Sequence, residues 1–353
     1  MNDQETPPSS TPTSDDASVV YGNDNTSTAV DEYRAAYTGV AVCDLSGRTQ
    51  LEVTGADRVT FLHNFCTNDI RRLQPGEGCE AFVTNIKGRI LGHVAIFAGE
   101  TAHWIDSSPD TANALLAHLD RYIITEDVTL RDASDWGTLA MIGPKAAKTL
   151  TRLLGIVLPV DPWTHLALRG EGLLSAAAVR RVPMTRPDCY TLVARKDALG
   201  DIWTNLFAAG AVFCGSHAWD ALRIESQYPR YGVDLSDALI AQEAGRTKQA
   251  ISFTKGCYLG QEPIARLDAL GHTNKELRGL SWDVSVAPFA GAEILESNGD
   301  GVVGTMTSAA AIPGEARGVG LGILKRDYLE PGTSVRIVSS EGPVTARVAP
   351  QFV

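Results

Sequence analysis

Hydrophobic and polar positions follow two kinds of spacing along this chain. Short runs of alternating or continuous apolar residues predict β-strands, and apolar residues three and four positions apart predict amphipathic helices. Strands are expected at 40–44, 49–53, 79–84, 90–97, 128–130 and 139–142. Helices are expected at 59–65, 111–122 and 145–154. This irregular mixture, with no dinucleotide-binding glycine fingerprint after any strand, favours an α+β fold over a doubly wound α/β fold.

The pattern changes from Leu277 onward. Strands are expected at 280–284, 302–308, 319–324 and 334–338, and turn dipeptides such as Asn298-Gly299 and Pro331-Gly332 separate them. The glycine-rich stretch 318–322 lies within one of these strands and lacks the later glycine of a phosphate loop, so it indicates close packing. A small all-β domain, barrel-like in form, is therefore predicted for residues 277–353.

The N-terminal segment differs from both of these regions. It contains no Lys or Arg before Arg34 and is rich in Ser, Thr, Pro, Asp and Asn. This composition predicts a disordered acidic tail over residues 1–32 and fits neither a secretory signal nor a mitochondrial presequence. The expected organisation is this tail, an α+β region at 33–276 and the β-domain at 277–353.

Charge and cysteine content narrow the class of protein. A net charge of −11 argues against direct nucleic-acid binding, which needs clustered Lys and Arg. No apolar run approaches the length of a membrane span, so no membrane partner is expected. The six cysteines form no CxxC pair or Cys/His cluster, which indicates neither disulfides nor structural zinc. We therefore expect a cytoplasmic protein without a permanently bound metal.

The run Lys255-Gly256-Cys257-Tyr258-Leu259-Gly260-Gln261-Glu262, here called the octet, is the densest motif. Its thiol lies between a cation and a predicted helix start, and both favour a thiolate. Cys257 and Lys255 are thus the candidate reactive residues, and the alternatives are an inert cysteine in a sharp turn and a surface lysine. The residues with expected structural roles in the turn and its helix are Gly256, Gly260, Gln261, Glu262 and Arg266, the last as an i,i+4 partner of Glu262.

Several segments together resemble one family. They are Leu222-Arg223-Ile224-Glu225, the stretch 229–234, Gln242-Glu243-Ala244-Gly245 and the octet, with weaker matches upstream at Thr67-Asn68-Asp69-Ile70 and Gly143-Pro144-Lys145. In this order they resemble the YgfZ family of folate-binding proteins. That family is related to the T-protein, the aminomethyltransferase of the glycine cleavage system, and to mitochondrial iron–sulfur assembly factors. The resemblance extends from about Tyr33 to the C-terminus.

The resemblance implies a cloverleaf of two interwoven α+β modules around a folate channel, plus a C-terminal β-barrel. It implies tetrahydrofolate or a derivative as ligand and iron–sulfur proteins or assembly factors as partners. The candidate folate contacts are Trp219, Arg223, Glu225, Tyr258 and Asn68. Each has an alternative structural role. Trp219 and Tyr258 would pack in the core, Arg223 would form a salt bridge with Glu225 or Asp220, and Asn68 would fix a turn. Cys257 would be a transient cluster ligand, because one thiol cannot hold a cluster alone.

The sequence departs from the T-protein pattern at two carboxylates. Gly92-His93 stands where T-proteins have an acidic pair, and the run 183–187 ends in Pro187 where they have a pterin-binding glutamate segment. Aminomethyltransferase catalysis is therefore not expected. Because no carboxylate stands beside His93 in the sequence, this histidine is predicted to be packed and neutral. The predicted function is support of iron–sulfur cluster assembly or repair, and thereby of tRNA modification. The alternatives are one-carbon transfer or demethylation with Asp69 or Asp234 as the acid, and a scaffold with an empty channel.

Overall fold

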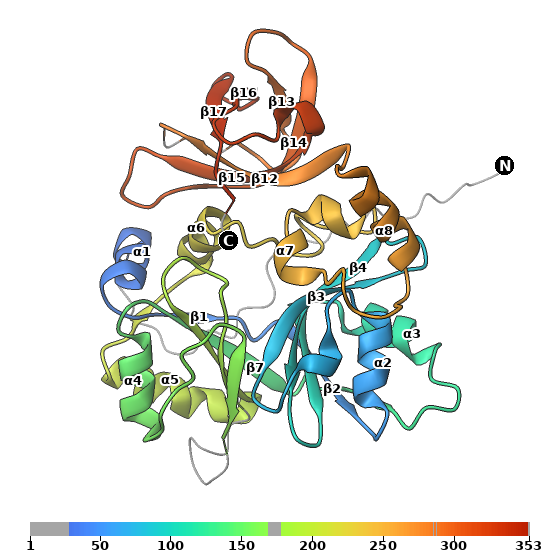
Figure 1. The fold of residues 1–353 in the computed structure, drawn as a ribbon. Helices are drawn as coiled ribbons and strands as arrows, with labels where there is room; N and C mark the ends of the chain where they lie inside the picture. Colours follow the sequence, from blue (N-terminus) through green and yellow to red (C-terminus); the bar gives the residue numbers. More distant parts are fainter. Residues whose placement is uncertain (1–27, 169–177, 285, 287, 352–353) are drawn as a thin grey trace, which may run out of the picture.

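The architecture is a pair of sheets with helices and one closed barrel. The structure is a computed structural model that describes residues 28–168, 178–284, 286 and 288–351. In the view of Figure 1 the barrel lies above two α+β lobes. One lobe contains a six-stranded sheet of β1 (Ala41–Asp44), β7 (Trp136–Ile142), β8 (Thr164–Ala167), β9 (Ala178–Arg181), β10 (Cys189–Arg195) and β11 (Val212–Phe213). The other contains a five-stranded sheet of β2 (Arg48–Thr54), β3 (Gly78–Thr84), β4 (Ile90–Ala98), β5 (His103–Pro109) and β6 (Thr129–Asp132).

The two lobes are interwoven along the chain. Strand β1 joins the six-stranded sheet, the chain then completes the five-stranded sheet, and β7 returns to pair with β1. The sheet orders are β11-β1-β7-β10-β9-β8 and β3-β4-β5-β2-β6. The pairings are antiparallel except between β1 and β11. The predicted α+β class with interwoven modules is therefore confirmed.

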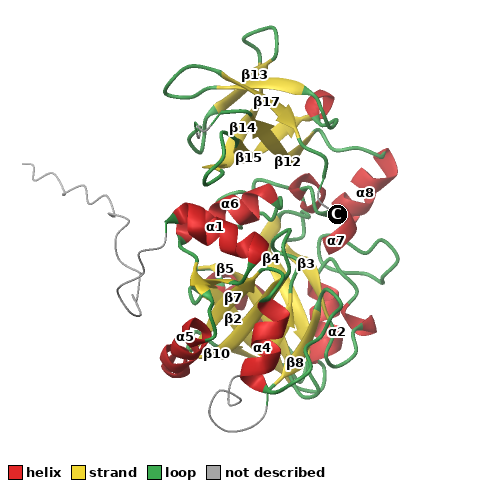
Figure 2. Ribbon diagram, turned by 90° about the vertical axis from the view of Figure 1, so that its left-hand side faces the viewer, coloured by secondary structure: helices red, strands yellow, loops and turns green. Residues whose placement is uncertain are grey.

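Helices cover the sheets and join them to the barrel. They are α1 (Ala29–Thr38), α2 (Arg58–Phe65), α3 (Ala112–Asp120), α4 (Ala146–Leu154), α5 (Leu199–Ala208), α6 (Ser216–Glu225), α7 (Thr247–Ala250) and α8 (Gln261–Leu270). Apolar residues of α4 and α5 pack on the six-stranded sheet, and those of α2 and α3 pack on the five-stranded sheet. Helices α1 and α6 lie between the lobes and the barrel (Figure 2). Burial of these apolar faces is what stabilises each helix, since none exceeds ten residues.

The C-terminal strands form a closed barrel, as predicted. Its order is β12 (Lys275–Trp282), β15 (Gly318–Lys325), β14 (Val302–Ala311), β13 (Glu293–Glu296), β16 (Ser334–Ile337) and β17 (Val344–Val348). A side chain at Gly318 would meet the Trp282 ring at 2.1 Å, which confirms close packing as the reason for glycine in this stretch. No helix within the described residues is long and apolar enough to span a membrane.

The predicted extent of the acidic tail is wrong at its C-terminal end. Residues 29–32 form the first turn of α1, which begins with a capping box between Thr28 and Asp31. Glu32 accepts a hydrogen bond from the Gly215 backbone at 2.9 Å, and Tyr33 is buried. A composition window averages over so short a cap and therefore misses the helix start. Residues 1–27 of the predicted tail lie outside the described residues.

Candidate functional site

The octet forms a tight turn clamped between two other segments. Its Leu259 donates from its backbone to Asn64 O at 2.9 Å, at the end of α2, and accepts from Thr84 Oγ1 at 2.8 Å, at the end of β3. Gly260 has φ +85°, and a Cβ there would lie 2.3 Å from the Asn85 carbonyl oxygen. Both observations require glycine, because an L side chain would be strained and would clash. The motif is thus a preformed turn that leads into α8.

Lys255 is the buried anchor of this turn. Its side chain is only 7% exposed, and Nζ donates to the carbonyl oxygens of His63 and Cys66 at 2.5 Å and of Asn68 at 2.8 Å. These carbonyls lie in the last turn of α2 or just after it, where orphan acceptors need a donor. Burial lowers the pKa of Lys255 to about 8. The predictions that it is a reactive partner of the thiol or a surface lysine are both wrong, because its three donors are used by the backbone.

Cys257 is exposed at the surface of the turn. The other five cysteines are buried or half-buried, and burial raises the pKa of Cys66 to about 12. No hydrogen bond joins Cys257 to Lys255 in the described part of the chain. Of the six thiols, Cys257 is therefore the one whose sulfur is open to an external ligand or reagent, and it is presented by a rigid backbone.

Tyr258 is the buried aromatic residue of the octet. Its ring centroid is 4.8 Å from Lys255 Nζ, a cation–π contact, and its buried hydroxyl has no hydrogen-bond partner within the described residues. Burial raises the pKa of this phenol to about 12, so it stays a donor. The Gln261 side chain accepts from the Tyr258 backbone at 3.3 Å, which confirms its structural role. Glu262 and Arg266 are both exposed on α8, and no ion pair joins them in the described structure, so the predicted helix pair is wrong.

Asn68 holds neighbouring loops together. Its amide nitrogen donates to Glu80 O at 2.8 Å and to Gln249 O at 3.0 Å, and its oxygen accepts from the Asp69 backbone at 2.9 Å. The nitrogen and the oxygen of the Asn68 amide are thus both hydrogen-bonded within the protein, as the turn-fixing alternative predicts. They are not available for the predicted contact with folate. Asp69 pairs with Arg72 at 3.0 Å and faces His63 Nδ1 at 3.3 Å.

Arg223 is an internal anchor between α6 and the barrel. It donates to Asp220 at 2.5 Å, to Asp234 at 2.9 Å and to Ser308 at 3.0 Å, and it is 3% exposed. Asp234 also accepts from Thr307 at 2.7 Å. The salt-bridge alternative is therefore correct for Asp220 and wrong for Glu225. The charged groups of Arg223 and Asp234 are both occupied by internal partners and are not available to a ligand. This argues against Asp234 as the acid in the one-carbon-transfer alternative.

Glu225 connects α1, α6 and the barrel. Its carboxylate accepts from Tyr33 at 2.7 Å, from Tyr37 at 2.5 Å and from Arg317 at 2.8 Å. Burial raises the pKa of Glu225, but the hydrogen bonds from Tyr37, Arg317 and Tyr33 outweigh it and lower the pKa below its usual value. Trp219 is half-buried against the core between the lobes, as its core alternative predicts.

A buried charge cluster in the five-stranded sheet was missed from the sequence. Arg246 donates to Glu80 at 2.8 and 2.5 Å, and His93 Nε2 lies 2.8 Å from the same carboxylate. Burial raises the pKa of Glu80, but Arg246 and His93 lower it to about 2. His93 is packed in the interior, as expected, and its neighbouring carboxylate comes from another strand, 13 residues away in the sequence. The β3–β4 register could have revealed this contact, because Phe82 pairs with His93 and places Glu80 on the same face.

A second buried cluster joins the two lobes. Asp106 of β5 accepts from Arg48 at 2.6 Å, from Gln50 at 2.7 Å and from Arg180 of β9 at 3.0 Å. Burial lowers the pKa of Arg180 to about 10, against the opposing effect of Asp106. Arg180 and Asp106 lie 74 residues apart in the sequence, so no local sequence signal predicts their contact. These contacts hold the two sheets together at this point, since a buried charge that lost its partner would be costly.

The chain by itself offers little for a metal. Within the described residues, no group of three or more His, Cys, Asp or Glu side chains could hold a metal ion. Cys257 supplies one thiol at the surface, and the other ligands of a cluster would have to come from another molecule.

Comparison with known proteins identifies the family. Residues 15–255 match the family described as the GCVT N-terminal domain. The chain belongs to this family. It is 30% identical over 94% of its length to a chloroplastic protein of Arabidopsis thaliana whose name provisionally assigns it to the transferases, covering 77% of that protein. It is also 30% identical over 91% of its length to the aminomethyltransferase of Frankia alni, covering 88% of it.

A solved structure supports the same architecture. The glycine cleavage system aminomethyltransferase T from Bartonella henselae superposes with a TM-score of 0.83 at 18% identity, covering 92% of this chain and 89% of that one. The chain therefore has the T-protein fold. The aminomethyltransferases of this family use tetrahydrofolate. Of the predicted folate contacts, Tyr258 has a buried hydroxyl that lacks a hydrogen-bond partner among the described residues.

Proposed function

We propose that this chain is a YgfZ-type folate-binding protein that supports iron–sulfur cluster assembly or repair, and thereby tRNA modification. The observation that carries the proposal is the exposed Cys257 thiol on a turn that Lys255 and Gly260 hold rigid. A folate beside the octet would meet Tyr258, whose hydroxyl has no partner within the described residues. The folate would supply one-carbon chemistry, and the thiol would act as one external ligand to a client cluster.

Two further features support a role other than aminomethyl transfer. At the position of the T-protein acidic pair the chain has Gly92 and His93, and the nearby carboxylate of Glu80 is engaged by Arg246. The segment that ends at Pro187 likewise offers no carboxylate. A carboxylate already bound to a guanidinium is a poor ligand for a pterin, since its lone pairs are used.

One-carbon transfer remains the second candidate, because the relatives are named aminomethyltransferases. In this alternative Asp69 would be the acid, since its carboxylate is half-buried and faces His63. Turnover separates the two candidates. Incubation with tetrahydrofolate and methylamine donors should yield methylene-tetrahydrofolate only if the second is correct.

The test of the first candidate uses two cysteine variants. Cys257→Ala should abolish the rescue of a cluster-dependent tRNA-thiolating or methylthiolating enzyme in a cell that lacks this protein. Cys79→Ala, which removes a half-buried thiol outside the octet, should retain it. Cys257→Ala should unfold at the wild-type temperature, because its thiol is exposed. Cys79→Ala should unfold slightly below it, because its thiol packs against the core of the five-stranded sheet. Full rescue by Cys257→Ala would refute the thiol's role.

Ligand binding and location complete the proposal. Tetrahydrofolate should bind the full chain in titration calorimetry, and the absence of binding would favour a scaffold. We also propose a cytoplasmic location. Six unpaired cysteines support it, because disulfides are rare in reducing compartments.

A further inference from the structure

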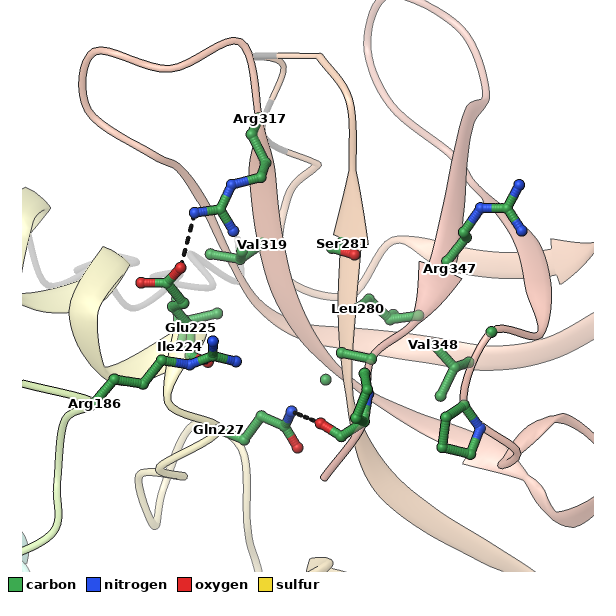
Figure 3. A pocket seen from close by; sticks show the side chains of 15 residues that line it. Arg186, Ile224, Glu225, Gln227, Leu280, Ser281, Arg317, Val319, Arg347 and Val348 are labelled. Atoms are coloured by element: carbon green, nitrogen blue, oxygen red, sulfur yellow. Dashed lines mark hydrogen bonds and ion pairs between the residues drawn. The ribbon is translucent and has the colours of Figure 1, made fainter. Parts of the chain in front are cut away.

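A cavity lies where helix α6 meets the barrel. Its volume is about 510 Å³, within the range of small-molecule sites. Its walls come from the loop between β9 and β10, the C-terminal end of α6 and the barrel strands β12, β15 and β17 (Figure 3). None of the octet residues lines it, so it is separate from the thiol turn.

The charges that line this cavity oppose the charge of the whole protein. Three arginines, Arg186, Arg317 and Arg347, face one carboxylate, that of Glu225. The chain as a whole carries a net charge of −11. A hollow in which one sign of charge predominates concentrates ions of the opposite sign, so this cavity favours anions more than the rest of the surface does.

The arginines that line the cavity differ in whether they already have partners. Arg317 pairs with Glu225 at 2.8 Å and with Glu315 at 3.0 Å. Arg347 is exposed on β17 and forms no hydrogen bond or ion pair with any described residue. It lies across the cavity from Arg186 and Arg317 (Figure 3). Its register partner on β12, Ser281, also has an unpartnered hydroxyl in the described structure. Strands β17 and β12 therefore offer donors that the described residues do not use.

The surface between these charges is apolar. Its accessible part comes from Pro331, Gly332, Ala349 and Pro350, and the buried side chains of Ile224, Leu280, Val319 and Val348 line the rest. A ligand that spans the cavity must therefore carry anionic groups separated by an apolar stem. Guanidinium groups match planar carboxylates with two parallel hydrogen bonds. We propose that this cavity binds an oligocarboxylate chain whose successive carboxylates are separated by methylene groups.

Two sources share this chemistry. One is the glutamyl tail of a folate, and this assignment rests on the proposed function. The other is a free oligocarboxylate such as a short γ-linked glutamate chain, which does not depend on folate binding. Arg223, the residue expected from the sequence to hold a glutamyl tail, is unsuitable because it is buried and fully paired.

The test measures binding to the full chain by titration calorimetry. The probes are pteroylmonoglutamate, pteroyltriglutamate, free tri-γ-glutamate and pyrophosphate. We expect pteroyltriglutamate to bind at least tenfold more tightly than pteroylmonoglutamate. Arg347→Ala should remove most of this difference, and Arg347→Glu should remove all of it. Arg326→Ala, which removes an exposed arginine outside the cavity, should leave it unchanged.

The outcomes separate this inference from the proposed function. If neither folate binds but tri-γ-glutamate binds and loses affinity in Arg347→Glu, the cavity site stands and folate binding fails. If both folates bind equally and tri-γ-glutamate does not bind, folate binding stands and the cavity assignment is overturned. The assignment is also overturned if Arg347→Glu behaves like Arg326→Ala, or if pyrophosphate competes as well as tri-γ-glutamate.

Discussion

The role of Lys255 gives the sharpest test of how the octet is built. Replacement by Met keeps the length and apolar stem of the side chain but removes the ammonium. Three carbonyl oxygens, those of His63, Cys66 and Asn68, then lose their donor in a site that is nearly closed to water. We therefore expect Lys255→Met to destabilise the protein, although the residue makes no contact with a ligand.

The size of the effect follows from two opposing contributions. Each hydrogen bond to a charged group contributes about 1.5–3 kcal/mol, so three give about 4.5–9 kcal/mol. Removing the ammonium also removes the cost of burying it, which is several kcal/mol. The net loss in the free energy of unfolding should be about 2–4 kcal/mol.

The assay is urea and thermal unfolding of Lys255→Met, Lys255→Arg and Cys257→Ala. Lys255→Arg is the informative control, because it keeps the positive charge but cannot direct three N–H groups to the same carbonyls. It should lose nearly as much stability as Lys255→Met, whereas Cys257→Ala should match the wild type. A Lys255→Arg variant as stable as the wild type would contradict the anchoring role. It would show that the positive charge alone, and not the three hydrogen bonds, stabilises the turn. Hydrogen exchange at 63–69 should accelerate in both lysine variants.

Two further predictions concern the turn and the α1 junction. Gly260→Ala should cost more than about 3 kcal/mol, since φ is +85° and the Asn85 oxygen would lie 2.3 Å from the new Cβ. Gly256→Ala should cost less than about 1 kcal/mol, because its nearest contact would be 3.8 Å away; equal melting temperatures for the two variants would rule out this account. Glu225 has a lowered pKa, so the unfolded chain takes up its proton more readily and the stabilisation it gives is lost as pH falls below about 4.5. The stability difference between wild type and Glu225→Gln, measured by urea unfolding across that range, should therefore shrink toward acid pH, and a constant difference would contradict the assigned hydrogen bonds.

Local spacing predicted much of the fold. The elements near 49–53, 79–84 and 90–97 form strands, and the glycine punctuation after Leu277 marks the turns of the barrel. Strand β5 (His103–Pro109) was missed because its polar residues do not alternate with apolar ones. It is buried nevertheless, since it pairs with β4 on one side and β2 on the other, and Asp106 is satisfied by cations from distant strands.

The octet illustrates what the sequence alone determined. Two glycines and a helix-forming segment predict a turn from local backbone preferences, so the motif and its thiol could be found without the fold. The exposure of Cys257 could not be found in this way, because it depends on how the turn packs on other segments. The partners of the charged residues could not be found in this way either. Lys255 binds carbonyls 187 to 192 residues away, and Arg246 binds a carboxylate 166 residues away. Dense packing forces each buried charge to find such a partner, and only the tertiary structure decides which one, because ionic contacts depend on distance in space and not along the chain.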